Sequence, residues 1–171
     1  SVLSSHGVSV TEERPKSVSE AERLWRRLFL ADGGVGVRRL MHVAGTEALS
    51  PALECTQTDE TLSITEYTEE LAKWNIYRSD MLAFMQQYDV VLCPVSATPA
   101  IRHDDPDGPD FTYTLAYNLT GWPGAVVRCG TSPEGLPIGV QIVARPWRED
   151  VALAVAHYLE TNLGGWQPPS P

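Results

Sequence analysis

The fold is decided by one short stretch of the chain, Tyr88-Asp89-Val90-Val91-Leu92-Cys93-Pro94. Its four central residues are apolar, two of them are β-branched, and none alternates with a polar neighbour. This pattern predicts a β-strand that is buried on both faces. Pro94 ends the strand because proline has no backbone N–H to donate to a neighbour.

The residues before this strand predict a long helix. Residues 63–87 contain neither glycine nor proline, and large apolar side chains recur at intervals of three and four. That spacing places them on one face of an amphipathic helix, which we expect to pack on the sheet. The side chains concerned are Tyr67, Leu71, Trp74, Tyr77, Met81, Phe84 and Met85.

The residues after the strand predict a loop, a short helix, a hairpin and a last helix. Residues 94–110 are rich in proline and aspartate and are expected to form a long exposed loop, and 111–119 a short helix. Residues 124–129 and 137–143 are expected to pair as antiparallel strands around a turn at 131–135, before a helix at 149–163. We expect all three strands in one sheet, with the chain in the α/β class.

The first 60 residues carry weaker patterns. Residues 8–13 alternate apolar and polar side chains and predict a strand, which Pro15 would close. Ser19 is expected to cap a helix that carries Ala21 and Leu24 on its apolar face. A second short helix is expected around residues 37–41, followed by an irregular segment from 45 to 59.

Composition excludes several classes of function. Thirteen Lys and Arg residues against 22 Asp and Glu residues give a net charge of −9, which disfavours binding to nucleic acid. The arginines at 23, 26 and 27 have helical spacing among acidic residues and are interpreted as a solvent-exposed helix face.

No apolar stretch reaches the roughly 18 to 20 residues of a membrane-spanning helix. The first residues lack the pattern of a secretory signal. Three cysteines without a CxxC spacing favour a reducing compartment, so we expect a cytoplasmic location.

Candidate nucleophiles are few. Ser4-Ser5-His6-Gly7 lacks the GxSxG context of a nucleophile loop and is better explained as the end of a helix. The only lysines, Lys16 and Lys73, lie far from any Gly- and Ser-rich loop. Cys93 lies in an apolar strand, where burial would raise the thiol pKa, so a structural thiol is expected.

No metal or cofactor site is expected. The four histidines have no HExxH spacing, and His103 beside Asp104 and Asp105 is interpreted as part of a solvated loop. The glycines at 130, 135 and 139 match neither GxGxxG nor a Walker motif. Spacing and composition alone therefore indicate an α/β domain without an assigned chemistry.

Three ordered stretches of the chain resemble segments of the amidase-signature family. Residues 88–99 resemble its "D, apolar strand, P, then T-P" segment, with Cys93 where Thr is common. Residues 111–124 resemble its "F/Y-T, Asn-Leu-x-Gly-x-Pro-Ala" segment, with Gly124 where the family usually has Ala. Residues 135–143 resemble its "G-L-P-x-G-x-Q" hairpin. Within the family, residues 113–118, 146–149 and 164–166 look most like the fatty-acid amide hydrolase branch.

The resemblance implies that residues 1–171 are the C-terminal portion of a single amidase domain, a mixed β-sheet covered by helices. Residues 1–60 match loosely, and residues 61–171 carry the motifs. It also implies a Ser–cis-Ser–Lys mechanism whose three residues lie upstream of this chain, so no catalytic residue is assigned here. The amide substrate would then be bound with the N-terminal portion, without a cofactor, and a homodimer of the whole enzyme is compatible with this assignment.

The same resemblance gives Phe111 and Leu115 a substrate-binding role. They lie four residues apart and share a face if residues 111–118 are helical. In the fatty-acid amide hydrolase branch that face lines the acyl channel; the alternative is that both are ordinary core residues. For the whole chain, the alternative is a free-standing, non-catalytic binding or relic domain of the same fold.

Overall fold

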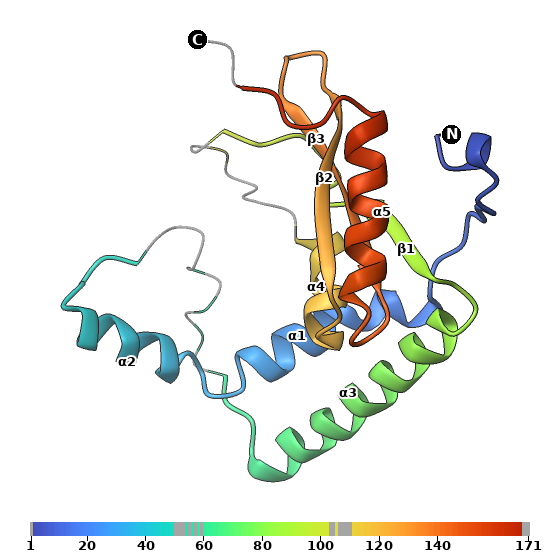
Figure 1. Ribbon diagram of the computed structural model, residues 1–171. Helices are drawn as coiled ribbons and strands as arrows, with labels where there is room; N and C mark the ends of the chain where they lie inside the picture. Colours follow the sequence, from blue (N-terminus) through green and yellow to red (C-terminus); the bar gives the residue numbers. More distant parts are fainter. Residues whose placement is uncertain are drawn as a thin grey trace.

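The computed structural model describes residues 2–49, 54, 56, 58, 60–102, 105 and 111–168. Within these ranges the helices and strands follow the order predicted from residue 63 onward (Figure 1). They are two 3-10 helices, η1 (Ser4–His6) and η2 (Lys16–Glu20), then α1 (Ala21–Phe29), α2 (Val35–Ala44), α3 (Ile64–Met85), β1 (Val90–Pro94), α4 (Thr112–Thr120), β2 (Gly124–Thr131), β3 (Pro137–Ala144) and α5 (Glu149–Asn162).

The three predicted strands form one sheet in the order β1-β3-β2. Both pairings are antiparallel, and Ile142 of β3 lies opposite Leu92 on one side and Ala125 on the other. The α/β class and the hairpin are therefore confirmed, and the strands that this chain supplies are antiparallel to one another.

Helices cover the two faces of the sheet and define two cores. On one side, Val143 packs with residues of α1, α3 and α4; we call this the three-helix core (Ala21, Leu24, Tyr77, Met81, Ala116, Tyr117, Leu119 and Val143). On the other side lies the α5 core (Leu3, Ile142, Ala144, Ala152, Ala156 and Leu159). Alternation along β3 sends successive side chains into opposite cores.

Helix α3 begins with a capping box. The Ser63 hydroxyl accepts a hydrogen bond from the Glu66 N–H at 3.3 Å, and the Glu66 carboxylate accepts one from the Ser63 N–H at 2.8 Å. The predicted long helix is confirmed. Its main neighbours are α1, η2 and α4 rather than the sheet, which it reaches through the three-helix core.

Two aromatic side chains fix α3 to α4. The Trp74 indole N–H donates to the Leu119 carbonyl at 2.7 Å, and the Tyr77 hydroxyl donates to the Ala116 carbonyl at 3.1 Å. Each side chain thus combines burial of a large ring with a hydrogen bond for its polar end.

Two expectations for the N-terminal part are wrong. Residues 8–13 form no strand, because they pair with no other backbone segment in the described part of the chain. Ser19 does not cap α1: its hydroxyl donates to the Lys16 carbonyl inside η2, and Glu20 is the residue before the helix. The 3-10 turn places the start of the helix later in the chain than the cap pattern indicated.

The arginines of α1 lie on a solvent-exposed face, as expected, but two of them also contact a buried carboxylate. Glu70 of α3 is 4% exposed, and its carboxylate accepts from Arg23 at 3.0 Å and from Lys73 at 2.9 Å. Arg27 lies 3.8 Å from the same carboxylate, whereas Arg26 pairs with Glu22 on the surface. Arg23 and Arg27 therefore attach α1 to α3.

The pKa of Glu70 reflects two opposing effects. Burial raises it, and the hydrogen bonds from Lys73 and Arg23 together with their charges lower it, so that it lies below its usual value. A carboxylate whose pKa is lowered by folding stabilises the fold above its unfolded pKa. That contribution is lost as the pH falls through the folded pKa.

We predict that Glu70→Gln lowers the free energy of unfolding by about 1–3 kcal/mol at pH 7, because two charge-assisted hydrogen bonds weaken in a buried position. Urea unfolding at pH 7 and at pH 3 measures this. At pH 3 the difference from the unsubstituted chain should shrink, since more of Glu70 is then protonated. Glu69→Gln, at an exposed neighbouring position, is the control. If Glu70→Gln lowered the free energy of unfolding equally at both pH values, the ion-pair role of Glu70 would be contradicted.

Candidate functional site

Strand β1 is an edge of the sheet, since β3 pairs with it on one side only. Its residues 90–93 are half-buried, and Pro94 is exposed. The expectation of a strand buried on both faces is therefore wrong for β1 in this chain. The reason is its position: β3, not β1, occupies the centre of the sheet.

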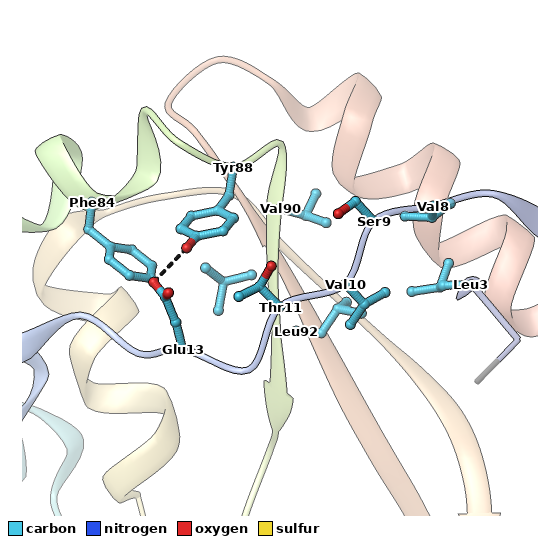
Figure 2. Close-up of a pocket in the computed structure, with 11 residues that line it drawn as sticks. Leu3, Val8, Ser9, Val10, Thr11, Glu13, Phe84, Tyr88, Val90 and Leu92 are labelled. Atoms are coloured by element: carbon cyan, nitrogen blue, oxygen red, sulfur yellow. Dashed lines mark hydrogen bonds between the residues drawn. The ribbon is translucent and has the colours of Figure 1, made fainter.

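An extended segment, residues 8–15, crosses this edge, and we call it the strap. Leu3, before the strap, belongs to the α5 core, whereas Val18, after it, packs against the three-helix core. The chain thus passes from one face of the sheet to the other around β1. Figure 2 shows Val10 and Thr11 lying across the strand.

One hydrogen bond fastens the strap to the turn after α3. The Tyr88 hydroxyl donates to the Glu13 carboxylate at 2.6 Å, drawn as a dashed line in Figure 2. This hydrogen bond, with a smaller effect of burial, raises the pKa of the Tyr88 hydroxyl. Phe84 packs on the Tyr88 ring with 4.9 Å between ring centroids.

Two hollows lie between the strap and β1. The first, of about 140 Å³, is walled mainly by apolar side chains and is the one in Figure 2. The second, of about 380 Å³, continues toward α4. Residues that line the first include Leu3, Val8, Val10, Phe84, Val90 and Leu92, and residues that line the second include Arg14, Val91, Cys93, Thr112, Tyr113 and Tyr117.

The second hollow contains a thiol and a phenol in contact. Cys93 Sγ lies 3.9 Å from the Tyr117 hydroxyl. Burial raises the pKa of the Cys93 thiol, as its apolar strand predicted, and burial likewise raises the pKa of Tyr117. A raised thiol pKa lowers the thiolate fraction at neutral pH, which favours a structural role for Cys93.

Gln141 fixes the geometry at this end of the sheet. Its amide nitrogen donates to the Pro94 carbonyl at 3.0 Å and to the Tyr113 carbonyl at 2.9 Å, and the side chain is buried. It thereby joins the end of β1 to the start of α4. In the sequence, this role of Gln141 is indicated only by the presence of one amide side chain in the otherwise apolar strand β3.

The two residues assigned to substrate binding lie at the start of α4, in different environments. Phe111 is the residue before the helix and is 55% exposed. Leu115, whose N–H donates to the Phe111 carbonyl at 2.9 Å, packs against the three-helix core. Their neighbours Thr112 and Tyr113, rather than these two residues, line the second hollow.

The other candidates do not assemble into a catalytic group. Ser5 and His6 bond to each other and to the Val2 carbonyl within a short turn. Lys73 is held by Glu70, and Lys16 is exposed on η2. Cys55, His103 and Asp104 lie outside the described residues.

Comparison with known families decides where this fold belongs. A family model described as Amidase matches residues 1–153. The chain belongs to the amidase family. In the described ranges of this amidase chain, no helix has the length and apolar composition needed to cross a bilayer.

Individual relatives agree with this assignment. Over 91 residues the chain is 36% identical to fatty-acid amide hydrolase 2 of Homo sapiens, and the match covers 52% of this chain and 17% of the human protein. Over 82 residues it is 42% identical to fatty-acid amide hydrolase 2-A of Danio rerio, and that match covers 47% of this chain and 15% of the fish protein.

A solved structure titled fatty acid amide hydrolase superposes on 95% of this chain with a TM-score of 0.80, at 16% identity. The superposed part is 35% of that hydrolase chain. The amidase-signature fold is thereby confirmed. The chain spans well under half the length of the proteins that it matches.

We predict that Gln141→Leu destabilises the chain by about 1–3 kcal/mol, because two carbonyl groups lose their partner in a buried position. Urea unfolding monitored by tryptophan fluorescence measures the change. Gln87→Leu, at an exposed position on the turn after α3, is the matched control and should have little effect. Equal stability of the two variants would show that Gln141 does not join β1 to α4.

Proposed function

We propose that this chain is the C-terminal part of an amide hydrolase that cleaves carbon–nitrogen bonds. The family match over residues 1–153 is the observation that carries the proposal. The superposition on a hydrolase structure over 95% of the chain supports it at the level of the fold.

The proposed chemistry is a Ser–cis-Ser–Lys mechanism in the portion of the enzyme that precedes this chain. The serine oxygen attacks the amide carbonyl while its proton passes through the bridging serine to the lysine. The amine leaves with a proton, and water then hydrolyses the acyl-enzyme to release the carboxylic acid and free serine. The lysines of this chain do not fit that role, since Lys73 is committed to Glu70 and Lys16 lies on an exposed turn.

The proposed contribution of this chain is the sheet and one wall of the acyl pocket. Phe111 supports the wall assignment because a large apolar ring, 55% exposed, stands next to the residues that line the second hollow. Covering such a ring with a hydrophobic acyl group is favourable by about 25 cal/mol per Å² of apolar surface. The printed name of the human relative, fatty-acid amide hydrolase 2, is consistent with a hydrophobic acyl group.

We predict that the isolated 171-residue chain hydrolyses no amide, because its described residues hold no activated nucleophile. Incubation of the purified chain with a panel of primary and N-substituted amides, followed by detection of released amine, measures this. The matched sample is the natural protein that carries these residues together with a Gly- and Ser-rich core. Turnover by the isolated chain that disappears on substitution of one of its own residues would contradict the proposal.

The same comparison separates the proposal from a free-standing, non-catalytic domain. If mass spectrometry of the natural protein finds a species close to the 18.8 kDa of this chain, and that species binds but does not hydrolyse amides, the hydrolase assignment fails. A much larger species that hydrolyses amides supports it.

We predict that Phe111→Ala in the whole enzyme lowers kcat/KM for long-chain acyl amides relative to short-chain ones by about 10-fold, because the pocket wall loses an exposed apolar ring. Steady-state kinetics with a series of acyl lengths measures the ratio. Phe29→Ala, which removes an exposed ring at the end of α1, is the matched control. An unchanged ratio would end the assignment of Phe111 to the pocket wall.

A further inference from the structure

Helix α2 exposes large apolar side chains that nothing in the described part of the chain covers. None of the residues of Val35–Ala44 is buried, and Figure 1 shows the helix standing apart from the sheet. Leu40 is 70% exposed and Val43 is 77% exposed. Covering such side chains is favourable by about 25 cal/mol per Å² of apolar surface, so this face favours an apolar ligand.

A groove of about 550 Å³ opens along this face of α2. Residues that line it include Gly36, Arg39, Leu40 and Val43. The last three lie three, four and seven residues after Gly36, so all four share one side of the helix. The groove therefore combines two apolar side chains with one cation.

Arg39 brings an uncompensated positive charge to the groove. It forms no ion pair with any residue that the structure describes. Of the described residues that line the groove, only Asp32 is acidic. Its two carboxylate oxygens already accept hydrogen bonds from the backbone N–H groups of Gly34 at 2.9 Å and Gly36 at 2.7 Å. An anionic group is thus complementary to Arg39, although the chain as a whole has a net charge of −9.

We propose that this groove binds a long-chain carboxylate. The carboxylate pairs with the Arg39 guanidinium, whose planar fork suits two parallel hydrogen bonds, and the alkyl chain lies along Leu40 and Val43. The site follows from the geometry, whereas naming the natural ligand as the acid released by amide hydrolysis rests on the proposed function. The groove receives the released acid and not the amide, so initial rates of hydrolysis do not depend on it.

Charge disfavours a second copy of this chain in the groove. Two α2 helices in contact would bring together the arginines at 38 and 39 of both chains, and α2 contains no acidic residue to pair with them. A bilayer surface is also disfavoured. Anionic lipids attract every cation near the surface, whereas only Arg39 of the two neighbouring arginines lines the groove.

Decanoate, kept below its critical micelle concentration, is the probe, and the natural protein that carries these residues is the sample. A spin-labelled analogue of the acid should broaden the methyl resonances of Leu40 and Val43. The methyl resonances of Leu153, exposed on α5, should stay sharp. Absence of broadening at Leu40 and Val43, or equal broadening at Leu153, would overturn the proposal.

Two neighbouring arginines provide a matched pair of variants. Arg38 and Arg39 are both exposed on α2, and neither forms an ion pair with a described residue, but only Arg39 lines the groove. Arg39→Gln should raise the Kd of decanoate, followed by the methyl shifts of Leu40 and Val43, by about 10-fold or more, because a charge-assisted hydrogen bond is lost. Arg38→Gln should leave the Kd unchanged. Equal effects of the two variants would contradict a defined site.

Two valines of α2 test the apolar wall in the same way. Val43 lines the groove, whereas Val35, which is 54% exposed, is not among the residues that line it. Val43→Ser should raise the Kd of decanoate by about 5-fold or more, because apolar surface is removed, and Val35→Ser should not. An unchanged Kd in Val43→Ser would contradict the placement of the alkyl chain.

Other occupants give different results. Retention of the protein by phosphatidylglycerol vesicles, without broadening by the monomeric acid, would identify a bilayer as the occupant, and the proposal fails. A dimer that Val43→Ser abolishes, without binding of decanoate, would identify a second copy, and the proposal also fails. If decanoate binds as described but no amide is hydrolysed, the site stands and the hydrolase assignment fails. Hydrolysis without binding of decanoate at α2 gives the opposite result.

Discussion

The structure depends on the burial of three consecutive residues of β3. Ile142, Val143 and Ala144 are at most 1% exposed, and they pair with β1 on one side and, at Ile142 and Val143, with β2 on the other. Because side chains alternate along a strand, Val143 enters the three-helix core while its two neighbours enter the α5 core. Every helix that covers the sheet therefore packs, directly or through another helix, on this short stretch.

Membership in the amidase family gives the remaining features a common explanation. The described residues hold well-formed structural groups, such as the Gln141 amide between two carbonyls and the Glu70 carboxylate among three cations. Burial raises the pKa of the Cys93 thiol, and Ser5 and His6 bond to each other within a turn. These described residues therefore serve the architecture of the amidase fold.

The sequence predicted those parts of the fold that local patterns determine. Helix α3 and the β2–β3 hairpin were predicted because their periodicity and turn residues operate over a few neighbours. The role of Glu70 was missed, since it depends on α1 crossing α3 and no spacing within either helix indicates it. The strand predicted at residues 8–13 does not form, because alternation of apolar and polar residues defines two faces but does not provide a strand to pair with. The candidate site at the edge of β1 was missed because the pairing of distant strands decides whether a strand lies at the edge or at the centre of a sheet. Phe111 and Leu115 were placed on one helix by spacing, but spacing could not show that one faces solvent and the other the core.

The path of the strap has a mechanical consequence. Because residues 8–15 run around the rim of the sheet, the segment before them is anchored among side chains of one layer and the segment after them among side chains of the opposite layer. A force that draws the beginning of the chain away from the body loads the contact of Leu3 with the α5 core first. It reaches the contact of Val18 with the three-helix core only after the first contact has broken, so the two layers should yield one after the other.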